Sequence, residues 1–586
     1  MSKKKSAPSH LTWANIRKYA GSYTVPFVFA MILATLGSIT TILGPDRLSE
    51  ITDTIAVGLT STIDTEKIKD IALFLAILYV LGAIMTYFQG FLITTVTQNF
   101  SKKLRRHVSE KIDRLPLQYF DSHKQGDTLS RVTNDLDTVG QSLSQSLATL
   151  APSITLLVGT IIMMFNSEWR LSLTVILSSL AGFALVAVIL ATSQKHFLAQ
   201  QVKLGAVSSY SEEIYSGHSV ITTYNAQNEV QETFEKLNMD LHGSVWKAQF
   251  LSGIMMPMMG FIGNFGYVMV CVIGSMLALN GTITFGVIVA FMIYVRIFTN
   301  PLSQLAQAFG NLQSASAALN RVFEFLSETE MKDESSKETQ LIHTRGNVSF
   351  EHVTFGYTAD QTIINDFSLE VTPGSKIAIV GPTGAGKTTI VNLLMKFYEI
   401  NQGDIRIDGK SILDMTRKEV HDQFCMVLQD TWLFEGSIKD NLIFNQKEVT
   451  DEAVIDACKA VGLHYFITTL PKGYETILDD SVELSVGQKQ LMTIARALIK
   501  QAPMLILDEA TSSVDTRTEE LIQKAMDKLM EGKTSFVIAH RLSTIRNADN
   551  ILVMDHGDII EQGNHDTLME NQGFYADLYN SQFSKG

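Results

Sequence analysis

The strongest chemical pattern in the sequence is a glycine-rich segment, GPTGAGKT, at residues 381–388. It matches the pattern G-x-x-x-x-G-K-[ST] at every fixed position. The apolar run KIAIV precedes it and an apolar-periodic stretch follows from Thr389 to Phe397, so we expect a strand before the loop and a helix after it. Glycines let backbone amides turn inward around phosphates, and the helix N-terminus adds its positive dipole end. The pattern therefore predicts a nucleotide phosphate site rather than a chance glycine-rich turn.

The residue types within this loop suggest individual roles. Lys387 is predicted to reach the β- and γ-phosphates, and Thr388 is predicted to ligate Mg²⁺. The residues of the loop that are expected to contact the nucleotide are Gly381, Thr383, Gly384, Gly386, Lys387 and Thr388.

A second apolar run ends in two acidic residues. Residues 504–507 read MLIL, and Asp508 and Glu509 follow them. Nucleotide sites in parallel sheets lie at the carboxyl ends of the strands, where these two side chains would stand. We predict that Asp508 holds Mg²⁺ through water and that Glu509 polarises the water that attacks the γ-phosphate. Solvated acids at an exposed strand end are the alternative, but together with the glycine-rich loop the segment indicates a nucleoside triphosphatase.

The composition places part of the chain in lipid. Of the 586 residues 18% are charged, whereas soluble domains carry roughly 25%. The formal net charge of −13 argues against nucleic acid as a partner, because phosphate backbones are bound by basic surfaces. The three cysteines are too few and too scattered for a disulfide framework or a zinc site, and buried inert thiols are expected.

Long runs without Asp, Glu, Lys or Arg indicate six membrane crossings, all before residue 300. Asn280-Gly281 is a turn signal that divides the longest run into two helices joined by a tight loop. The uncharged runs are Thr24 to Gly44, Ile71 to Phe100, Thr138 to Ser167, Leu171 to Gln194, and Ala248 to Val295.

Basic residues predict the orientation of these crossings. They gather before the first crossing and after the second, while the segment between these two crossings is acidic. Under the positive-inside rule the N-terminus and the long connectors, roughly 101–137 and 195–247, lie in the cytoplasm. The connectors have apolar positions at helical spacing, so they are expected to extend the membrane helices. No convincing cleavage site follows the first apolar run, which favours an anchor over a removed signal peptide. The expected location is the plasma membrane.

These observations divide the chain into four parts. We expect an interfacial helix within residues 1–23, a six-helix transmembrane domain at 24–326, a polar linker at 327–346 and a nucleotide-binding domain at 347–586. The fold class is therefore multidomain: an α-helical transmembrane domain with long cytoplasmic helical extensions, followed by an α/β P-loop nucleotide-binding domain.

Further motifs resemble those of the ATP-binding cassette (ABC) family. Residues 484–488, LSVGQ, resemble its signature motif, and Tyr357 resembles its adenine-stacking aromatic residue. Gln429 resembles the Q-loop glutamine, residues 512–515 the D-loop, and His540 the switch histidine, all in family order. In the membrane half, two segments resemble the coupling loops of exporters: residues 116–135, and the segment with Glu213, Gly217, Val220 and Tyr224. The chain thus resembles an ABC exporter half-transporter over nearly its whole length.

The resemblance implies further site residues. ATP and Mg²⁺ are the expected cofactors, with Glu509, His540 and Gln429 as catalytic residues and Thr388, Gln429 and Asp508 near the metal. Tyr357 is expected to stack on adenine, and Thr389 adds a hydroxyl that suits Mg²⁺. Signature residues of this family face the ATP held by the other subunit, so a dimer is implied. The signature residues expected to contact that ATP are Ser485, Gly487 and Gln488.

Two departures from the family pattern bear on the partner. Val486 stands where the family usually has glycine, and a β-branched side chain resists any positive φ. Residues 478–481, LDDS, replace the usual stretch that communicates with the coupling loops. Heterodimeric exporters often pair an irregular signature with an intact catalytic glutamate in one chain, as here with Glu509. A heterodimer is therefore favoured, and a homodimer is the alternative.

The resemblance implies ATP-driven export of amphipathic or drug-like compounds by alternating access. Methionines and aromatic residues flank Pro257 in the fifth crossing and suit varied apolar ligands, although ordinary packing explains them as well. Membrane lipids and a small amphipathic substrate are the expected partners, in addition to the second half-transporter. A lipid flippase of the same architecture is the first alternative, and a non-transporting, ATP-gated membrane sensor subunit is the second.

Overall fold

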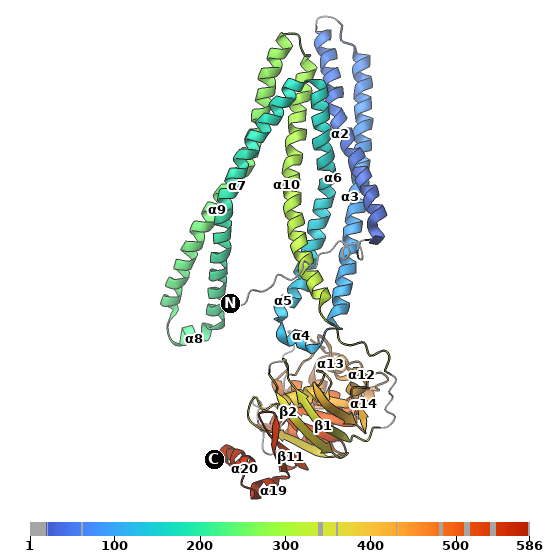
Figure 1. The fold of residues 1–586 in the computed structure, drawn as a ribbon, viewed down its shortest axis with the longest axis vertical. Coiled ribbons are helices and arrows are strands. Elements are labelled where there is room, and N and C mark those ends of the chain that lie inside the picture. The colour runs from blue at the N-terminus through green and yellow to red at the C-terminus, as the bar shows by residue number, and fades with distance from the viewer. Residues whose placement is uncertain are drawn as a thin grey trace. The chain divides into compact units, whose positions relative to one another are not determined.

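The chain forms two compact units, each drawn as a ribbon in Figure 1. Met1–Asp113 and Gln125–Glu328 form the helical unit, and Arg114–Lys124 and Thr329–Gly586 form the α/β unit. The computed structural model describes residue 19 and residues 21–59, 62–337, 344–358, 361–428, 431–479, 484–508, 516–538 and 546–583.

Among the residues that the structure describes, six helices of the helical unit are long and apolar enough to cross a membrane. At 1.5 Å per residue each is longer than the roughly 30 Å of a hydrocarbon core, so each extends beyond the lipid. Pro45 does not end the first of these helices, and Gly281, with a φ of 69°, forms the turn before the last. The six are α2 (Thr24–Gly58), α3 (Thr65–Ile112), α6 (Leu136–Ser167), α7 (Trp169–Ser216), α9 (Gln227–Leu279) and α10 (Phe285–Ser327).

The long helices pack in two groups. α7 lies along α9, while α2, α3, α6 and α10 pack against one another. Figure 1 shows the α7–α9 pair leaning away from the other four helices, with α8 (His218–Thr223) joining its ends. The unit also contains the short elements η1 (Gly21–Tyr23), α5 (Gln125–Ser130) and η2 (Arg131–Asp135).

Small residues and polar contacts hold the helical unit together, as in other membrane bundles. A Cβ atom at Gly182 of α7 would lie 2.4 Å from the Ile262 side chain of α9, so glycine permits this close approach. The Ser153 hydroxyl of α6 lies 2.9 Å from Gln304 Oε1 of α10. At the start of α10, the Asp53 carboxylate accepts hydrogen bonds of 2.7 Å from the Gly286 amide and the Thr284 hydroxyl.

A six-stranded sheet, in the order β12-β11-β3-β10-β9-β6, is the centre of the α/β unit. β11, β3, β10, β9 and β6 run parallel and only β12 is antiparallel among them. Parallel strands are buried on both faces, which explains the continuous apolar runs in the sequence. The strands are β3 (Lys376–Val380), β6 (Phe424–Val427), β9 (Met504–Asp508), β10 (Thr534–Ile538), β11 (Asn550–Asp555) and β12 (Asp558–Gly563).

A four-stranded antiparallel sheet, β2-β1-β4-β5, and the small pair β7-β8 accompany it. These strands are β1 (Val348–Phe355), β2 (Ile364–Val371), β4 (Gln402–Ile407), β5 (Lys410–Ser411), β7 (Gly436–Ser437) and β8 (Ile477–Leu478). The helical elements of this unit are α4 (Leu117–Ser122), α11 (Lys387–Leu394), α12 (Arg417–Asp422), α13 (Ile438–Ile443), α14 (Asp451–Ala460), α15 (His464–Thr469), η3 (Gly473–Glu475), α16 (Val486–Lys500), α17 (Thr516–Met530), α19 (His565–Glu570) and α20 (Phe574–Phe583).

Two apolar cores cover the two faces of the six-stranded sheet. Along β3, Ala378 and Val380 belong to one core and Ile377 and Ile379 to the other, as alternation along a strand requires. α16 packs into the first core and α11 into the second. The fold class predicted from the sequence is confirmed: six long apolar helices, then an α/β nucleotide-binding fold.

The three cysteines are free thiols, and the expected burial is confirmed for two of them, whereas Cys271 is only partly buried. Cys425 and Cys458 are buried, and burial raises the pKa of the Cys458 thiol to about 11. A thiol with so high a pKa is a poor nucleophile at neutral pH.

Candidate nucleotide-binding site

The glycine-rich loop leaves β3 in the middle of the six-stranded sheet and leads into α11. Gly381 has a φ of 151° and Gly386 a φ of 99°, both in the region that favours glycine. A Cβ atom at Gly381 would lie 2.2 Å from the Met554 carbonyl oxygen, so no larger residue fits there. Gly386 precedes α11 without a side-chain cap, which leaves the first amides of the helix to a phosphate ligand.

Lys387, the first residue of α11, turns back over the loop. Its ammonium group donates hydrogen bonds of 2.8 Å to the Gly381 carbonyl and 2.9 Å to the Pro382 carbonyl. The side chain is 8% exposed, and its burial lowers the pKa of Lys387 while the Asp508 carboxylate opposes that shift. Asp508 ends β9, so the structure brings the two predicted phosphate and metal residues to one edge of the sheet.

The donor atoms near Lys387 suit a hard divalent cation. The Thr388 side chain is exposed at the start of α11, and the Asp508 carboxylate interacts with the Lys387 cation. Hydroxyl and carboxylate oxygens are the ligands that Mg²⁺ prefers. The residues present therefore fit the Mg²⁺ that accompanies a bound nucleoside triphosphate. Thr383 and Gly384 are exposed in the same loop.

Tyr357 lies against the first turns of α11. Its hydroxyl is 3.1 Å from the Thr389 hydroxyl and accepts a hydrogen bond of 3.4 Å from the Asn392 amide. The ring packs edge-on against Phe355 and Tyr398, with centroids 5.0 and 4.9 Å apart. These contacts fix an aromatic face beside the glycine-rich loop.

The short helix α4 touches the same pair of tyrosines. The Tyr398 hydroxyl donates a hydrogen bond to the Asp121 carboxylate, and Gln118 Nε2 donates one of 3.0 Å to the Tyr357 carbonyl. Burial first, and then the Asp121 carboxylate, raise the pKa of Tyr398. The α4 segment carries a recognisable sequence pattern, whereas the only sequence signal of Tyr398 is its place directly after the apolar-periodic run that forms α11.

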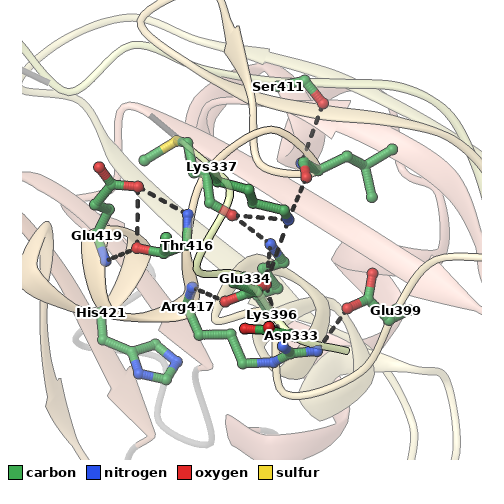
Figure 2. A network of polar contacts seen from close by, with 12 residues as sticks. Asp333, Glu334, Lys337, Lys396, Glu399, Ser411, Thr416, Arg417, Glu419 and His421 are labelled. Carbon is green, nitrogen blue, oxygen red and sulfur yellow. Dashed lines mark hydrogen bonds and ion pairs between the residues drawn. The ribbon is translucent and has the colours of Figure 1, made fainter. Parts of the chain in front are cut away.

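A partly buried ionic network, drawn in Figure 2, fastens residues after α10 to the segment that directly follows α11. The Glu334 carboxylate lies 2.9 Å from the Lys396 ammonium and 3.1 Å from the Arg417 guanidinium. Burial raises the pKa of Glu334, but hydrogen bonds from the Arg417 amide and Lys396 and both positive charges outweigh it and lower the pKa to about 2. Lys396 is 1% exposed, although lysine is usually an exposed residue. Its partners are distant in the sequence, so no local sequence pattern predicts this network.

The signature segment begins α16. The Ser485 hydroxyl accepts a hydrogen bond of 3.2 Å from the Gln488 amide, and Gln488 Oε1 accepts one of 2.9 Å from the Ser485 amide. Val486 is the first helical residue, is 54% exposed and does not have a positive φ. The conformational conflict expected at Val486 is therefore absent. Gly487 is buried beneath it.

The glycine-rich loop and the signature segment of this chain do not form one common site. α11 and α16 cover opposite faces of the six-stranded sheet. Gln429, Glu509 and His540, together with residues 480–483 and the D-loop residues 512–515, lie outside the described residues. In the helical unit, Tyr224 directly follows α8, is 78% exposed, and none of the residues of α8 is buried.

Two family models match the chain. The model described as ABC transporter transmembrane region matches residues 27–302, and the model described as ABC transporter matches residues 364–512. The chain is 46% identical over 511 residues to a fatty acid ABC transporter ATP-binding/permease protein of Mycobacterium bovis, covering 87% of this chain and 80% of the relative.

Two further relatives extend the match to almost the full length. An uncharacterized ABC transporter ATP-binding protein of Bacillus subtilis is 39% identical over 560 residues, 95% of this chain and 92% of the relative. An ATP-dependent lipid A-core flippase of Colwellia psychrerythraea is 31% identical over 590 residues, 98% of this chain and 97% of the relative.

Proposed function

This chain belongs to the ABC transporter family, as an exporter half-transporter whose ATP hydrolysis is coupled to transport, and we propose that it exports amphipathic compounds that carry an acyl chain. The observation that carries this proposal is the 46% identity to a relative named as a fatty acid transporter. This identity narrows the substrate class that we propose from amphipathic and drug-like compounds in general to amphipathic compounds with an acyl chain.

We propose the following roles in the nucleotide site. The loop from Gly381 to Thr388 holds the phosphates of ATP, with Lys387 at the β- and γ-phosphates. Thr388, Gln429 and Asp508 hold Mg²⁺, which supplies charge neutralisation at the phosphates. Tyr357 stacks on adenine. Glu509 takes a proton from the attacking water, and His540 donates a hydrogen bond to the γ-phosphate.

The ATP site is completed by a second half-transporter in this proposal. Because α11 and α16 cover opposite faces of one sheet, Ser485, Gly487 and Gln488 are directed at the ATP of the partner. A different partner chain is our first hypothesis, since an irregular signature accompanies Glu509. The helical backbone of Val486 leaves the signature amides intact, which keeps a second copy of this chain as the alternative.

The chain is an integral membrane protein, and we propose a plasma-membrane location with the N-terminus and nucleotide-binding domain in the cytoplasm. The division into residues 1–23, 24–326, 327–346 and 347–586 is part of the same proposal. Basic residues before α2 and after α3 support this orientation.

A lipid flippase is the second candidate function. Full-length similarity to relatives named lipid A-core flippases supports it. A flippase moves a bilayer lipid from one leaflet to the other, whereas an exporter of acyl-chain compounds moves its substrate across the whole membrane.

Proteoliposomes test both functions. The purified assembly should accumulate a fluorescent fatty acid in inside-out vesicles only with ATP and Mg²⁺, and not with the Glu509→Gln variant. ATP-dependent exposure of a fluorescent phospholipid without fatty acid flux would favour the flippase. Nucleotide-dependent conformational change with no flux of either probe would contradict export and favour the sensor subunit.

A further inference from the structure

The turn that ends α11 contains an unusual residue. The Phe397 amide donates a hydrogen bond to the Asn392 carbonyl, and the Lys396 amide donates one to the Leu393 carbonyl. This pair of bonds forms a Schellman motif, in which the residue after the C-cap has a positive φ and is usually glycine. Lys396 takes this place with a φ of 53°. Lysine adopts the left-handed conformation less readily than glycine, so contacts of the Lys396 side chain offset a backbone cost.

The buried Lys396 side chain meets two acceptors from distant parts of the chain. Its ammonium group donates a hydrogen bond of 2.6 Å to the Met415 carbonyl and lies 2.9 Å from the Glu334 carboxylate. The Arg417 amide donates a hydrogen bond of 2.6 Å to the same carboxylate, and Figure 2 draws these contacts as one network. A buried cation is costly unless it is paired and hydrogen-bonded, so the position of Lys396 depends on Glu334.

Glu334 belongs to the segment that follows α10, residues 329–337, which we call the strap. It lies seven residues after Ser327, the last residue of α10. The strap turns at this point, since the Lys337 amide donates a hydrogen bond of 3.1 Å to the Glu334 carbonyl. The Lys337 ammonium group donates one of 3.2 Å to the Met415 carbonyl. The strap therefore binds the same carbonyl that holds the residue after α11.

α11 is too short to define its own position. It has eight residues, about two turns, and isolated helices of this length are unstable in water. Its buried face packs into an apolar core, but apolar contacts are not directional. The ion pair and hydrogen bonds at Lys396 have a defined geometry. At 1.5 Å per residue they act about 13 Å from Lys387, and a shift of this end along the axis moves the phosphate-binding loop with it.

We propose that Glu334 and Lys396 are positioning residues for the phosphate-binding loop and raise its affinity for ATP from the other end of α11. This inference rests on the proposed binding of the ATP phosphates by the loop from Gly381 to Thr388. Neither side chain contacts the nucleotide: Glu334 holds Lys396, and Lys396 holds the end of the helix. Because the strap follows α10 in the chain, ATP binding at α11 and the position of the strap influence each other.

The test measures equilibrium ATP binding, KM and kcat for the full-length assembly in lipid vesicles, at a temperature where every variant is folded. Glu334→Gln should weaken ATP binding and raise the KM for ATP about fivefold or more, because the loop is no longer preorganised. The kcat should stay within about twofold of wild type. A purely structural role would lower the folded fraction and hence kcat, and would leave KM unchanged.

Lys396→Gly separates positioning from folding. Glycine suits the positive φ after the C-cap, so α11 should end as in wild type while Glu334 loses this partner. This variant should raise KM about as much as Glu334→Gln, and the double variant should raise it no further, because both changes break the same contact. Lys396→Arg keeps the charge and should restore part of the affinity.

Glu399→Gln is the matched control. The Glu399 carboxylate lies 2.6 Å from Arg417 in the same network, and its printed ion pair does not involve Lys396. This variant should keep the ATP affinity and KM of wild type, because the contact between Glu334 and Lys396 remains.

Three results would overturn the positioning role: wild-type KM in Glu334→Gln and Lys396→Gly, additive effects in the double variant, or an equal rise of KM in Glu399→Gln. Lys387→Ala distinguishes this failure from failure of the proposed nucleotide site. If Lys387→Ala weakens ATP binding while Glu334→Gln and Lys396→Gly do not, only the positioning role is wrong. If ATP affinity is unchanged in all three variants, the loop does not hold the phosphates.

Discussion

The helices α11 and α16 both begin at segments suited to phosphate, but their first turns are built differently. α11 starts after Gly386 without a side-chain cap, and its first residue is the buried cation Lys387. α16 starts after Ser485, whose hydroxyl and amide are both paired with Gln488. The start of α11 therefore has free amide groups and a positive charge that can bind a phosphate held by this chain.

The start of α16 is exposed, and its capping hydrogen bonds between Ser485 and Gln488 are already formed. It therefore has fewer free amide groups than the start of α11 to donate to a phosphate. In the proposed dimer, this chain therefore binds ATP with the uncapped start of α11 and presents the capped start of α16 to the ATP of its partner. Opposite placement on the sheet prevents the two from being used together in one chain.

The largest effect is expected from Glu509→Gln, which removes the proposed base and leaves the cradle at α11 intact. Turnover should fall about 100-fold or more, because a positioned base contributes roughly 10²–10⁴-fold, whereas ATP affinity should be retained. Phosphate release and equilibrium nucleotide binding measure the two effects. Glu452→Gln, at the exposed start of α14, is the matched control. Undiminished hydrolysis by Glu509→Gln would contradict the assigned role.

The next effect concerns the far end of α11. The pKa of Glu334 falls from 4.5 to about 2 on folding, so its contribution is complete above about pH 4.5 and is lost as the pH falls toward about 2. Glu334→Gln should lower the free energy of unfolding at pH 7 by about 3 kcal/mol. The difference from wild type should shrink between pH 4.5 and pH 2.

Thermal unfolding at several pH values measures this contribution. Glu232→Gln breaks an exposed ion pair with Lys236 and should change stability by less than about 1 kcal/mol. Equal losses in the two variants would show that the network around Glu334 does not anchor α11.

A cap exchange sharpens the contrast at α16. Ser485→Ala and Thr450→Ala each remove an N-cap hydroxyl, from α16 and α14, and each should cost about 1 kcal/mol of stability. Only Ser485→Ala should also reduce ATP turnover, by about tenfold, because only that cap belongs to the segment that we propose contacts a partner's ATP. Similar turnover in the two variants would assign Ser485 a purely structural role.

The smallest effect is expected at the contact between α4 and the tyrosines. Tyr398→Phe removes the hydrogen bond to Asp121 and should reduce substrate moved per ATP a few-fold, about 1 kcal/mol of coupling, with ATP binding unchanged. Tyr474→Phe, which removes a hydroxyl bonded to His464, is the control. Flux per ATP equal to wild type in Tyr398→Phe would remove α4 from the coupling route.

Local patterns in the sequence predicted the crossings and the glycine-rich loop, because each depends on neighbouring residues. The end of the uncharged run at Gly44 indicates where the chain leaves the lipid, not where the helix ends. The helix α2 continues through Pro45 to Gly58. Charge reports the solvent around a helix, whereas backbone hydrogen bonding determines where it ends.

Contacts between distant segments could not be predicted in this way. Asp121 and Tyr398 are 277 residues apart, and Glu334 meets Lys396 and Arg417 only through the folded sheet. The concern about Val486 followed from residue type alone. The structure removes it because the first turn of α16 needs only an ordinary helical φ.

The most direct test measures ATP binding and hydrolysis by the chain purified in lipid, separated by particle mass into single and paired half-transporters. The account predicts ATP binding by both particles and turnover only by the paired one, whether the partner is a second copy or a different chain. Turnover at the same rate per site by the single half-transporter would contradict the claim that α16 completes a partner's site.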